Sequence, residues 1–156
     1  MLRVLERHGV RYVVIGALAA IAAGAPLVTR DLDITPDRVS DNLDRLAWAL
    51  RELDARLRIP HAPEGMPFPV EAAMLATANI WMLTTRTGDL DLVFEPAGTR
   101  GFDDLRRDAT QLEVAGGATV LVASLADVIR SKEAAAREKD LGQLPLLRRT
   151  LERIRS

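Results

Sequence analysis

Short runs of β-branched and other apolar residues alternate along the chain with longer segments whose apolar residues recur every three to four positions. The first pattern is typical of strands and the second of amphipathic helices. Strands are predicted for residues 11–16, 31–35, 80–85 and 89–94, and within 111–124. The segment 80–94 predicts a hairpin that turns at Thr87-Gly88, and the segment 111–124 predicts two short strands around Gly116-Gly117.

Helices are predicted for residues 2–8, 17–24, 40–57, 101–109, 125–138 and 140–155. Ser40 is the expected N-cap of the third helix, and Ser124 followed by Asp127 predicts a capping box for the fifth. Residues 58–79 contain four prolines and show no clear periodicity, so both a surface loop and a lid over a cleft stay open for them.

This order of elements predicts a mixed α/β (α+β) domain with a largely antiparallel sheet and helices packed mainly on one side. The length of 156 residues, with 48% hydrophobic residues, fits one domain over 1–156 that has a helical C-terminal part from about residue 125. There is no cysteine and no apolar run of the length that spans a membrane, so we expect a cytoplasmic protein without disulfides.

Charge is unevenly distributed. Residues 130–156 carry a net charge of +4, whereas the rest of the chain carries −5. A basic C-terminal segment suits a polyanionic ligand, although a solvated helix surface explains the same pattern.

The stretch "VTRDLDI" (28–34) places two carboxylates two residues apart in a predicted strand. Because side chains alternate along a strand, Asp31 and Asp33 are expected on one face, with their Cα atoms about 6.5–7 Å apart. Mg²⁺ is the natural partner of such a pair, since it binds carboxylates and bridges phosphates. An exposed edge strand with solvated carboxylates is the alternative.

Two further features favour the metal site over the exposed edge strand. In "GDLDLVF" (88–94), Asp91 lies deep in a strand and supplies a third carboxylate, whereas Asp89 is explained as a turn residue. Gly16 ends the first strand and opens a helix, where a glycine lets a phosphate approach the backbone N–H groups.

Ile15-Gly16-Ala17, Asp31-Leu32-Asp33 and Asp91 together resemble the signature of the DNA polymerase β-like nucleotidyltransferase superfamily. With "VASLADVIRSKEAAAREKD" (122–140), the chain looks like the minimal bacterial nucleotidyltransferases, including the AbiEii/MenT-type toxins. The resemblance implies transfer of a nucleoside monophosphate from a nucleoside triphosphate (ATP or another NTP) to a hydroxyl, with Mg²⁺, two ions being possible. It implies that Asp31, Asp33 and Asp91 hold the metal, and that Gly16 and Ala17 bind the triphosphate.

The C-terminal segment adds Lys132, which falls on the apolar face of its helix. A lysine there either extends to the rim or reaches a phosphate or carboxylate. The resemblance favours Lys132 as a nucleotide-binding residue, and Arg137 more weakly, because Glu133 predicts an ordinary helix pair with Arg137. Ala17 and Gln143 depart from the family pattern, which commonly has Ser or Gly at the first position and often an Asp at the second.

The predicted function is therefore a nucleotidyltransferase that modifies RNA such as tRNA, as the toxin of a toxin–antitoxin pair with a cognate antitoxin protein and no membrane association. Transfer to a protein or a small molecule is the second hypothesis. The third is a catalytically weak nucleotide-binding or interaction module, which Ala17 supports. His8 and His61 are the only histidines and lie far apart in sequence, so a zinc site or a Ser-His-Asp triad is not expected.

Overall fold

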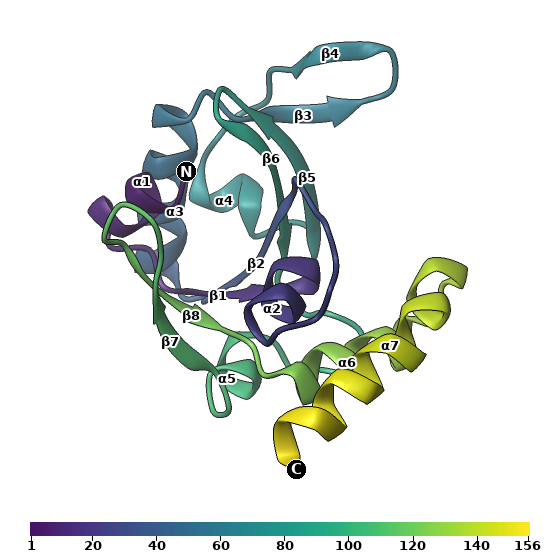
Figure 1. Ribbon diagram of the computed structural model, residues 1–156. Helices are drawn as coiled ribbons and strands as arrows, with labels where there is room; N and C mark the ends of the chain where they lie inside the picture. Colours follow the sequence, from purple (N-terminus) through teal and green to yellow (C-terminus); the bar gives the residue numbers. More distant parts are fainter.

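The computed structural model describes residues 1–156 and contains one eight-stranded sheet and seven helices (Figure 1). The strands are β1 (Tyr12–Ile15), β2 (Leu32–Pro36), β3 (Arg56–Ile59), β4 (Ala62–Met66), β5 (Ile80–Thr85), β6 (Gly88–Val93), β7 (Thr110–Glu113) and β8 (Thr119–Val122). The helices are α1 (Leu2–Arg7), α2 (Gly16–Ala22), α3 (Ser40–Glu52), α4 (Ala72–Leu75), α5 (Phe102–Leu105), α6 (Leu125–Ala135) and α7 (Glu138–Arg155).

The strands follow the spatial order β4-β3-β5-β6-β2-β1-β8-β7. Only two neighbouring pairs are parallel, β1 with β8 and β2 with β6, and the other pairs are antiparallel. The sheet is therefore mixed and largely antiparallel, as the sequence predicts. None of the helices combines the length and apolar character that crossing a membrane requires.

One face of the central strands forms the main hydrophobic core. Ile34 of β2 and Leu90 and Leu92 of β6 are completely buried there, in one cluster with Leu46 and Leu50 of α3. Alternate positions of each strand point to the same side of a sheet, so the apolar residues of β2 and β6 leave the remaining positions on the opposite face.

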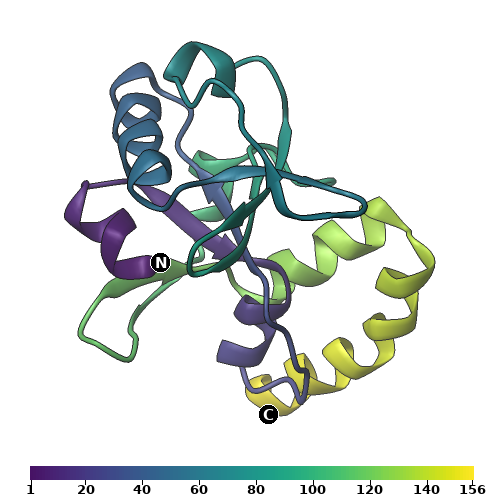
Figure 2. The same cartoon turned by 90° about the horizontal axis from the view of Figure 1, so that it is seen from above.

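The helices are divided between the two faces, rather than packed mainly on one side as the sequence predicts (Figures 1 and 2). On the core face, Trp81 Nε1 of β5 donates a hydrogen bond of 3.1 Å to the carbonyl oxygen of Leu75, which anchors α4 beside α3. On the opposite face α2 packs against β1, β2 and α6, and α6 in turn packs against α7. Along β5 this second face is open, since Met82 is 51% exposed.

The third predicted helix is too long at its C-terminus. Helix α3 ends at Glu52 because Asp54 adopts a left-handed conformation, with φ of 51°, and the chain then enters β3. Its N-cap is Val39 rather than Ser40, which is the first helical residue. By contrast, Ser124 caps α6 as predicted, its Oγ accepting a hydrogen bond of 3.1 Å from the Asp127 N–H.

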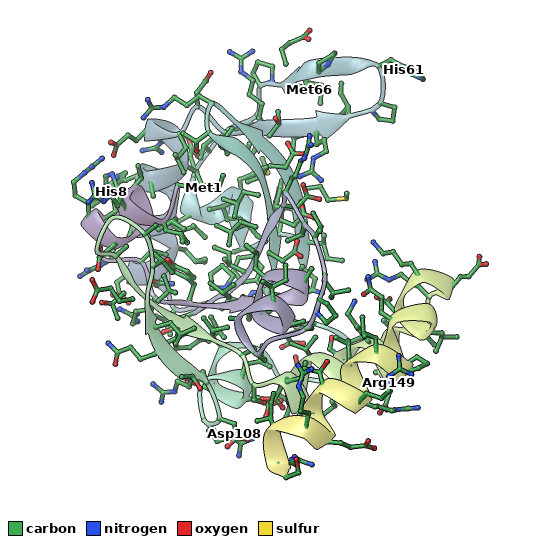
Figure 3. The ribbon with its side chains drawn as sticks, viewed as in Figure 1. Met1, His8, His61, Met66, Asp108 and Arg149 are labelled. Atoms are coloured by element: carbon green, nitrogen blue, oxygen red, sulfur yellow. The ribbon has the colours of Figure 1, made fainter.

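The proline-containing stretch 58–79 is more regular than its sequence indicates. It holds the end of β3, all of β4 and helix α4, and the β3–β4 hairpin turns at Pro60-His61. Pro63 is accommodated because β4 is the edge strand of the sheet, where a missing N–H costs no ladder hydrogen bond. Figure 3 shows this hairpin, which carries His61 and Met66, extending away from the body of the protein.

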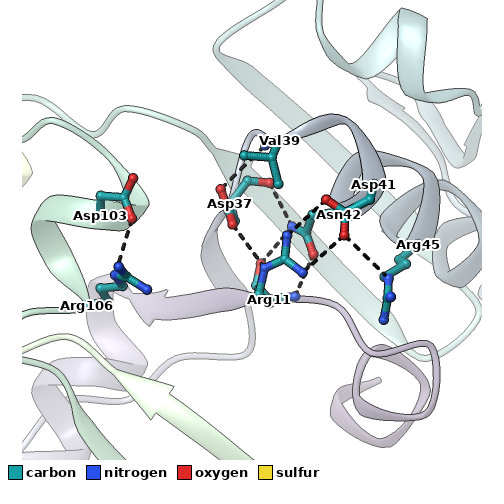
Figure 4. Close-up of polar contacts among 8 residues, drawn as sticks. All are labelled: Arg11, Asp37, Val39, Asp41, Asn42, Arg45, Asp103 and Arg106. Carbon is teal, nitrogen blue, oxygen red and sulfur yellow. Dashed lines mark hydrogen bonds and ion pairs between the residues drawn. The ribbon is translucent and has the colours of Figure 1, made fainter.

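A buried side-chain amide joins β1 and β2 to α3 (Figure 4). The side chain of Asn42 is completely buried, and its Oδ1 accepts a hydrogen bond of 2.7 Å from the Arg11 N–H. Its Nδ2 donates to the carbonyl oxygens of Arg11 at 2.9 Å and Asp37 at 2.7 Å. The start of β1 and the end of β2 are thereby fixed to the first turn of α3, which orients the strand that carries Asp33.

We predict that Asn42→Ala destabilises the protein by about 2–4 kcal/mol, because it leaves the Arg11 N–H and the Asp37 carbonyl oxygen without this partner and removes one of two donors to the Arg11 carbonyl oxygen. Chemical denaturation monitored by circular dichroism measures this loss. Asp44→Ala, at an exposed position of the same helix, is the matched control and should change the unfolding free energy by less than about 0.5 kcal/mol. An equal effect of the two substitutions would contradict the role of the buried amide.

Candidate active site

The junction between β1 and α2 lies directly beside Asp33. Gly16 begins α2 with φ of +66°, a conformation that residues with a side chain rarely adopt. A Cβ atom added at this position would collide with Oδ2 of Asp33. Two structural features therefore require glycine at position 16, namely its backbone conformation and the close approach of the Asp33 carboxylate, and its role in binding a triphosphate stays a prediction.

Two carboxylates lie side by side on neighbouring parallel strands. Asp33 of β2 is the register partner of Asp91 of β6, and neighbouring strands are about 4.8 Å apart. Both residues are partly buried, the Asp91 side chain being 20% exposed. The structure thus brings Asp33 and Asp91 together on one face of the sheet, as the sequence predicts, and their role in a site stays a prediction.

This arrangement disfavours a second negative charge. Burial above all, followed by the negative charges of Asp91 and Asp31 and a hydrogen bond with Asp91, raises the pKa of Asp33 to about 6. The positive charge of Lys139 acts in the opposite direction. Asp33 itself makes no ion pair, and a buried carboxylate beside a second one is the donor chemistry that a hard divalent ion satisfies.

Asp31 is placed less favourably than the sequence predicts. It lies one residue before β2, is exposed, and its backbone N–H donates to Thr29 Oγ1 at 3.3 Å. No group of three or more His, Cys, Asp or Glu side chains is arranged to hold a metal ion. Asp31, Asp33 and Asp91 have the right chemistry for Mg²⁺ but do not converge as a ready-made cage, so their metal role stays a prediction.

Lys132 and Arg137 both bind one carboxylate. Asp140 of α7 is completely buried, and it accepts hydrogen bonds from Lys132 Nζ at 3.0 Å and from Arg137 Nε at 2.6 Å. Burial by itself would raise the pKa of Asp140, but the hydrogen bonds from Arg137 and Lys132 and the positive charges of both residues together hold the pKa below its usual value. Lys132 thus reaches a carboxylate instead of extending to the rim, which is one of the two alternatives expected from the sequence. The expected pair of Arg137 with Glu133 is wrong, since Glu133 pairs with Arg148 at 2.6 Å.

Three residues near the carboxylates were not among the predicted site residues. Lys139 is exposed, and its charge acts on Asp33, while Asp140 organises the start of α7. Arg58 of β3 donates from Nη2 to Asp91 Oδ1 at 2.7 Å and lies 3.4 Å from Asp89 Oδ2. Lys139 and Asp140 could have been found from the sequence, because the adjacent pair belongs to the segment that resembles the nucleotidyltransferases. No sequence pattern indicates Arg58, because the strand that carries it is not predicted.

We predict that Asp33→Asn stabilises the metal-free protein at pH 7.5 by on the order of 1–3 kcal/mol. An acid whose folded pKa lies above its unfolded value of 3.8 destabilises the folded state as pH rises from about 4 through 6. The advantage of the variant should therefore shrink toward zero near pH 4 in denaturation series without metal. Asp31→Asn, at an exposed position, should give a much smaller gain, and a destabilised Asp33→Asn protein at pH 7.5 would refute the crowding of the two carboxylates.

We predict that Gly16→Ala lowers the unfolding free energy by about 1–3 kcal/mol, because a side chain at positive φ is strained and displaces Asp33. Gly142→Ala is the matched control. Gly142 lies inside α7 with ordinary φ and with open space around its Cβ position, so alanine there should stabilise the protein by up to about 1 kcal/mol. Thermal and chemical unfolding measure both, and changes of the same sign would contradict the structural requirement for Gly16.

No protein-family model matches the chain, and no curated protein matches it in sequence. Among solved structures, it resembles TM1012 from Thermotoga maritima, described as a "putative nucleotidyltransferase", with a TM-score of 0.52. The two chains are 17% identical, and the match covers 97% of this chain and 89% of that one. The likeness establishes the fold: this chain has a nucleotidyltransferase fold, of the mixed α/β class that its sequence predicts.

Proposed function

We propose that the protein is a Mg²⁺-dependent nucleotidyltransferase that moves a nucleoside monophosphate from an NTP to an acceptor hydroxyl. The observation that carries this proposal is the pairing of Asp33 with Asp91 across β2 and β6, next to a glycine that leaves no side chain beside Asp33. The nucleotidyltransferase fold supports it, since a site of this kind belongs where these strands and α2 meet.

In this proposal Asp33 and Asp91 are the principal ligands of Mg²⁺, and Asp31 joins them by a rotation of its exposed side chain. The ion would neutralise the carboxylates and the triphosphate during transfer. Gly16 and Ala17 present backbone N–H groups and no side-chain hydroxyl to a phosphate. The acceptor oxygen attacks the α-phosphorus, pyrophosphate leaves, and Asp91 or a water molecule receives the hydroxyl proton.

The cation that contacts the triphosphate is assigned first to Lys139. Lys132 and Arg137 are already bound to Asp140, so either must leave a buried carboxylate before it can reach a phosphate. Lys139 follows directly on the segment that these ion pairs hold in place, and it makes no ion pair of its own. Lys132 and Arg137 then act by positioning the start of α7.

The acceptor is proposed to be RNA, tRNA in particular, in the cytoplasm and in the setting of a toxin with a cognate antitoxin. The support is the resemblance to the AbiEii/MenT-type enzymes and the basic surface of α7, which includes the labelled Arg149 (Figure 3). Transfer to a protein or small molecule by the same site is the second candidate. The third candidate is a catalytically weak nucleotide-binding or interaction module, which the absence of a side-chain hydroxyl at Ala17 supports.

The direct test incubates the full chain with each α-labelled NTP, Mg²⁺ and total tRNA. We predict label on tRNA and release of pyrophosphate, with a loss of at least about a hundredfold in Asp33→Ala because the metal site loses a ligand. Label on protein would support the second candidate, and NTP binding without pyrophosphate release would support the third. A failure of the wild-type protein to bind any NTP in the presence of Mg²⁺ would overturn all three.

We further predict that Lys139→Ala raises the KM for the NTP by about tenfold or more, since a charge-assisted hydrogen bond to phosphate is lost. Arg155→Ala, which removes an exposed cation from the far end of α7, is the control and should leave the KM unchanged. Steady-state rates against NTP concentration provide the comparison. Equal KM values in wild type and Lys139→Ala would remove Lys139 from the triphosphate site.

A further inference from the structure

Arg58 is held among the carboxylates of β6. Its Nη2 donates to Asp91 Oδ1 at 2.7 Å and to the carbonyl oxygen of Leu83 at 2.8 Å, and its Nε lies 3.4 Å from Asp89 Oδ2. The three charged side chains are only 20–38% exposed. One guanidinium thus sits between two carboxylates at the side of the site opposite to α2.

The guanidinium reaches this place from outside the central strands. Strand β3 is separated from β6 by β5, so Arg58 extends across the backbone of β5, beside the position where Met82 faces Asp91. Its Nε is buried and makes no hydrogen bond, although it is a good donor. The contact is therefore strong toward Asp91 but leaves one donor of the guanidinium unsatisfied.

Occupation of Asp91 by Arg58 conflicts with metal binding at the same carboxylate. A Mg²⁺ ion binds carboxylate oxygens at about 2.0–2.1 Å and demands near-octahedral geometry. A guanidinium hydrogen-bonded to Asp91 Oδ1 occupies one lone pair of that oxygen, and its positive charge repels an ion bound to the same carboxylate.

We propose that Arg58 is the resident counter-cation of this site and competes with the divalent metal, so that metal entry requires the guanidinium to leave Asp91. This inference rests on the proposed function, because it takes Asp33 and Asp91 as the metal site. Arg58 is a positioning residue, since it acts on the metal through Asp91.

The exchange also connects the metal to the β3–β4 hairpin. Only Arg56 and Leu57 of β3 pair in register with β5, and the register between β3 and β4 shifts between Leu57 and Ile59. The ion pair of Arg58 with Asp91 is thus an additional tether of the hairpin to the body of the protein. Its release frees the segment 59–66, which lies at the edge of the sheet and extends from the body (Figure 3).

The test is a Mn²⁺ titration without nucleotide or acceptor, with free Mn²⁺ followed by electron paramagnetic resonance. We expect Arg58→Gln to bind Mn²⁺ about tenfold more tightly than wild type, the equivalent of removing one charge-assisted competitor. Arg58→Lys retains a positive charge and should lie between the two. Arg56→Gln is the matched control: Arg56 lies two residues earlier on β3 and pairs only with Asp54, at 3.5 Å, so its affinity should equal that of wild type.

Equal or weaker Mn²⁺ binding in Arg58→Gln than in wild type, with the fold verified by circular dichroism, would overturn the competition. The variants Asp33→Asn and Asp91→Asn separate this failure from that of the proposed function. If they abolish Mn²⁺ binding while Arg58→Gln shows no gain, the metal site stands and only the role of Arg58 is refuted. If no variant and no wild-type protein binds Mn²⁺, both proposals fall.

A second readout does not depend on affinity. Amide hydrogen exchange of residues 59–66 should become at least severalfold faster when Mn²⁺ saturates the wild-type protein, because the tether is released. In Arg58→Gln the exchange should already be fast without metal and should not change on addition of Mn²⁺. Slower exchange of this segment in metal-bound wild type would contradict the displacement.

Discussion

The repulsion between Asp33 and Asp91 is the interaction on which the rest of the site depends. Parallel pairing of β2 with β6 places the two carboxylates in register on one face of the sheet, and burial prevents water from screening them fully. The fold keeps this unfavourable pair although an amide at position 33 would be less costly to bury. Such a retained cost is typical of functional sites, and it is the basis on which we propose this place for a divalent cation.

The surrounding cations differ in how firmly they are held. Lys132 and Arg137 are bound to the completely buried Asp140 and join α6 to α7, a structural role. Lys139 is exposed, makes no ion pair and acts on Asp33 only by its charge. Arg58 is intermediate, bound to Asp91 through a contact that leaves its Nε unsatisfied. These differences are why we propose a structural role for Lys132 and Arg137, phosphate binding for Lys139 and an exchangeable contact for Arg58.

Local patterns in the sequence predicted most of the elements that carry the site. Alternation placed Asp33 and Asp91 on strands, and Gly16 marked the strand–helix junction. The errors have nonlocal causes. The end of α3 depends on the left-handed Asp54, and β4 tolerates Pro63 only because it is an edge strand, which composition does not reveal. Ion-pair partners were the least predictable. The helical spacing predicts Glu133 as the partner of Arg137, whereas the chain turns between α6 and α7 and Arg137 pairs with Asp140 in the first turn of α7.

The most direct measurement is a crystal structure of the full chain with Mn²⁺ and a non-hydrolysable NTP, with anomalous data that locate the metal. The account predicts an anomalous peak about 2.1–2.2 Å from carboxylate oxygens of both Asp33 and Asp91, with the triphosphate beside Gly16. A nucleotide bound elsewhere on the protein, or a metal that contacts neither Asp33 nor Asp91, would contradict it.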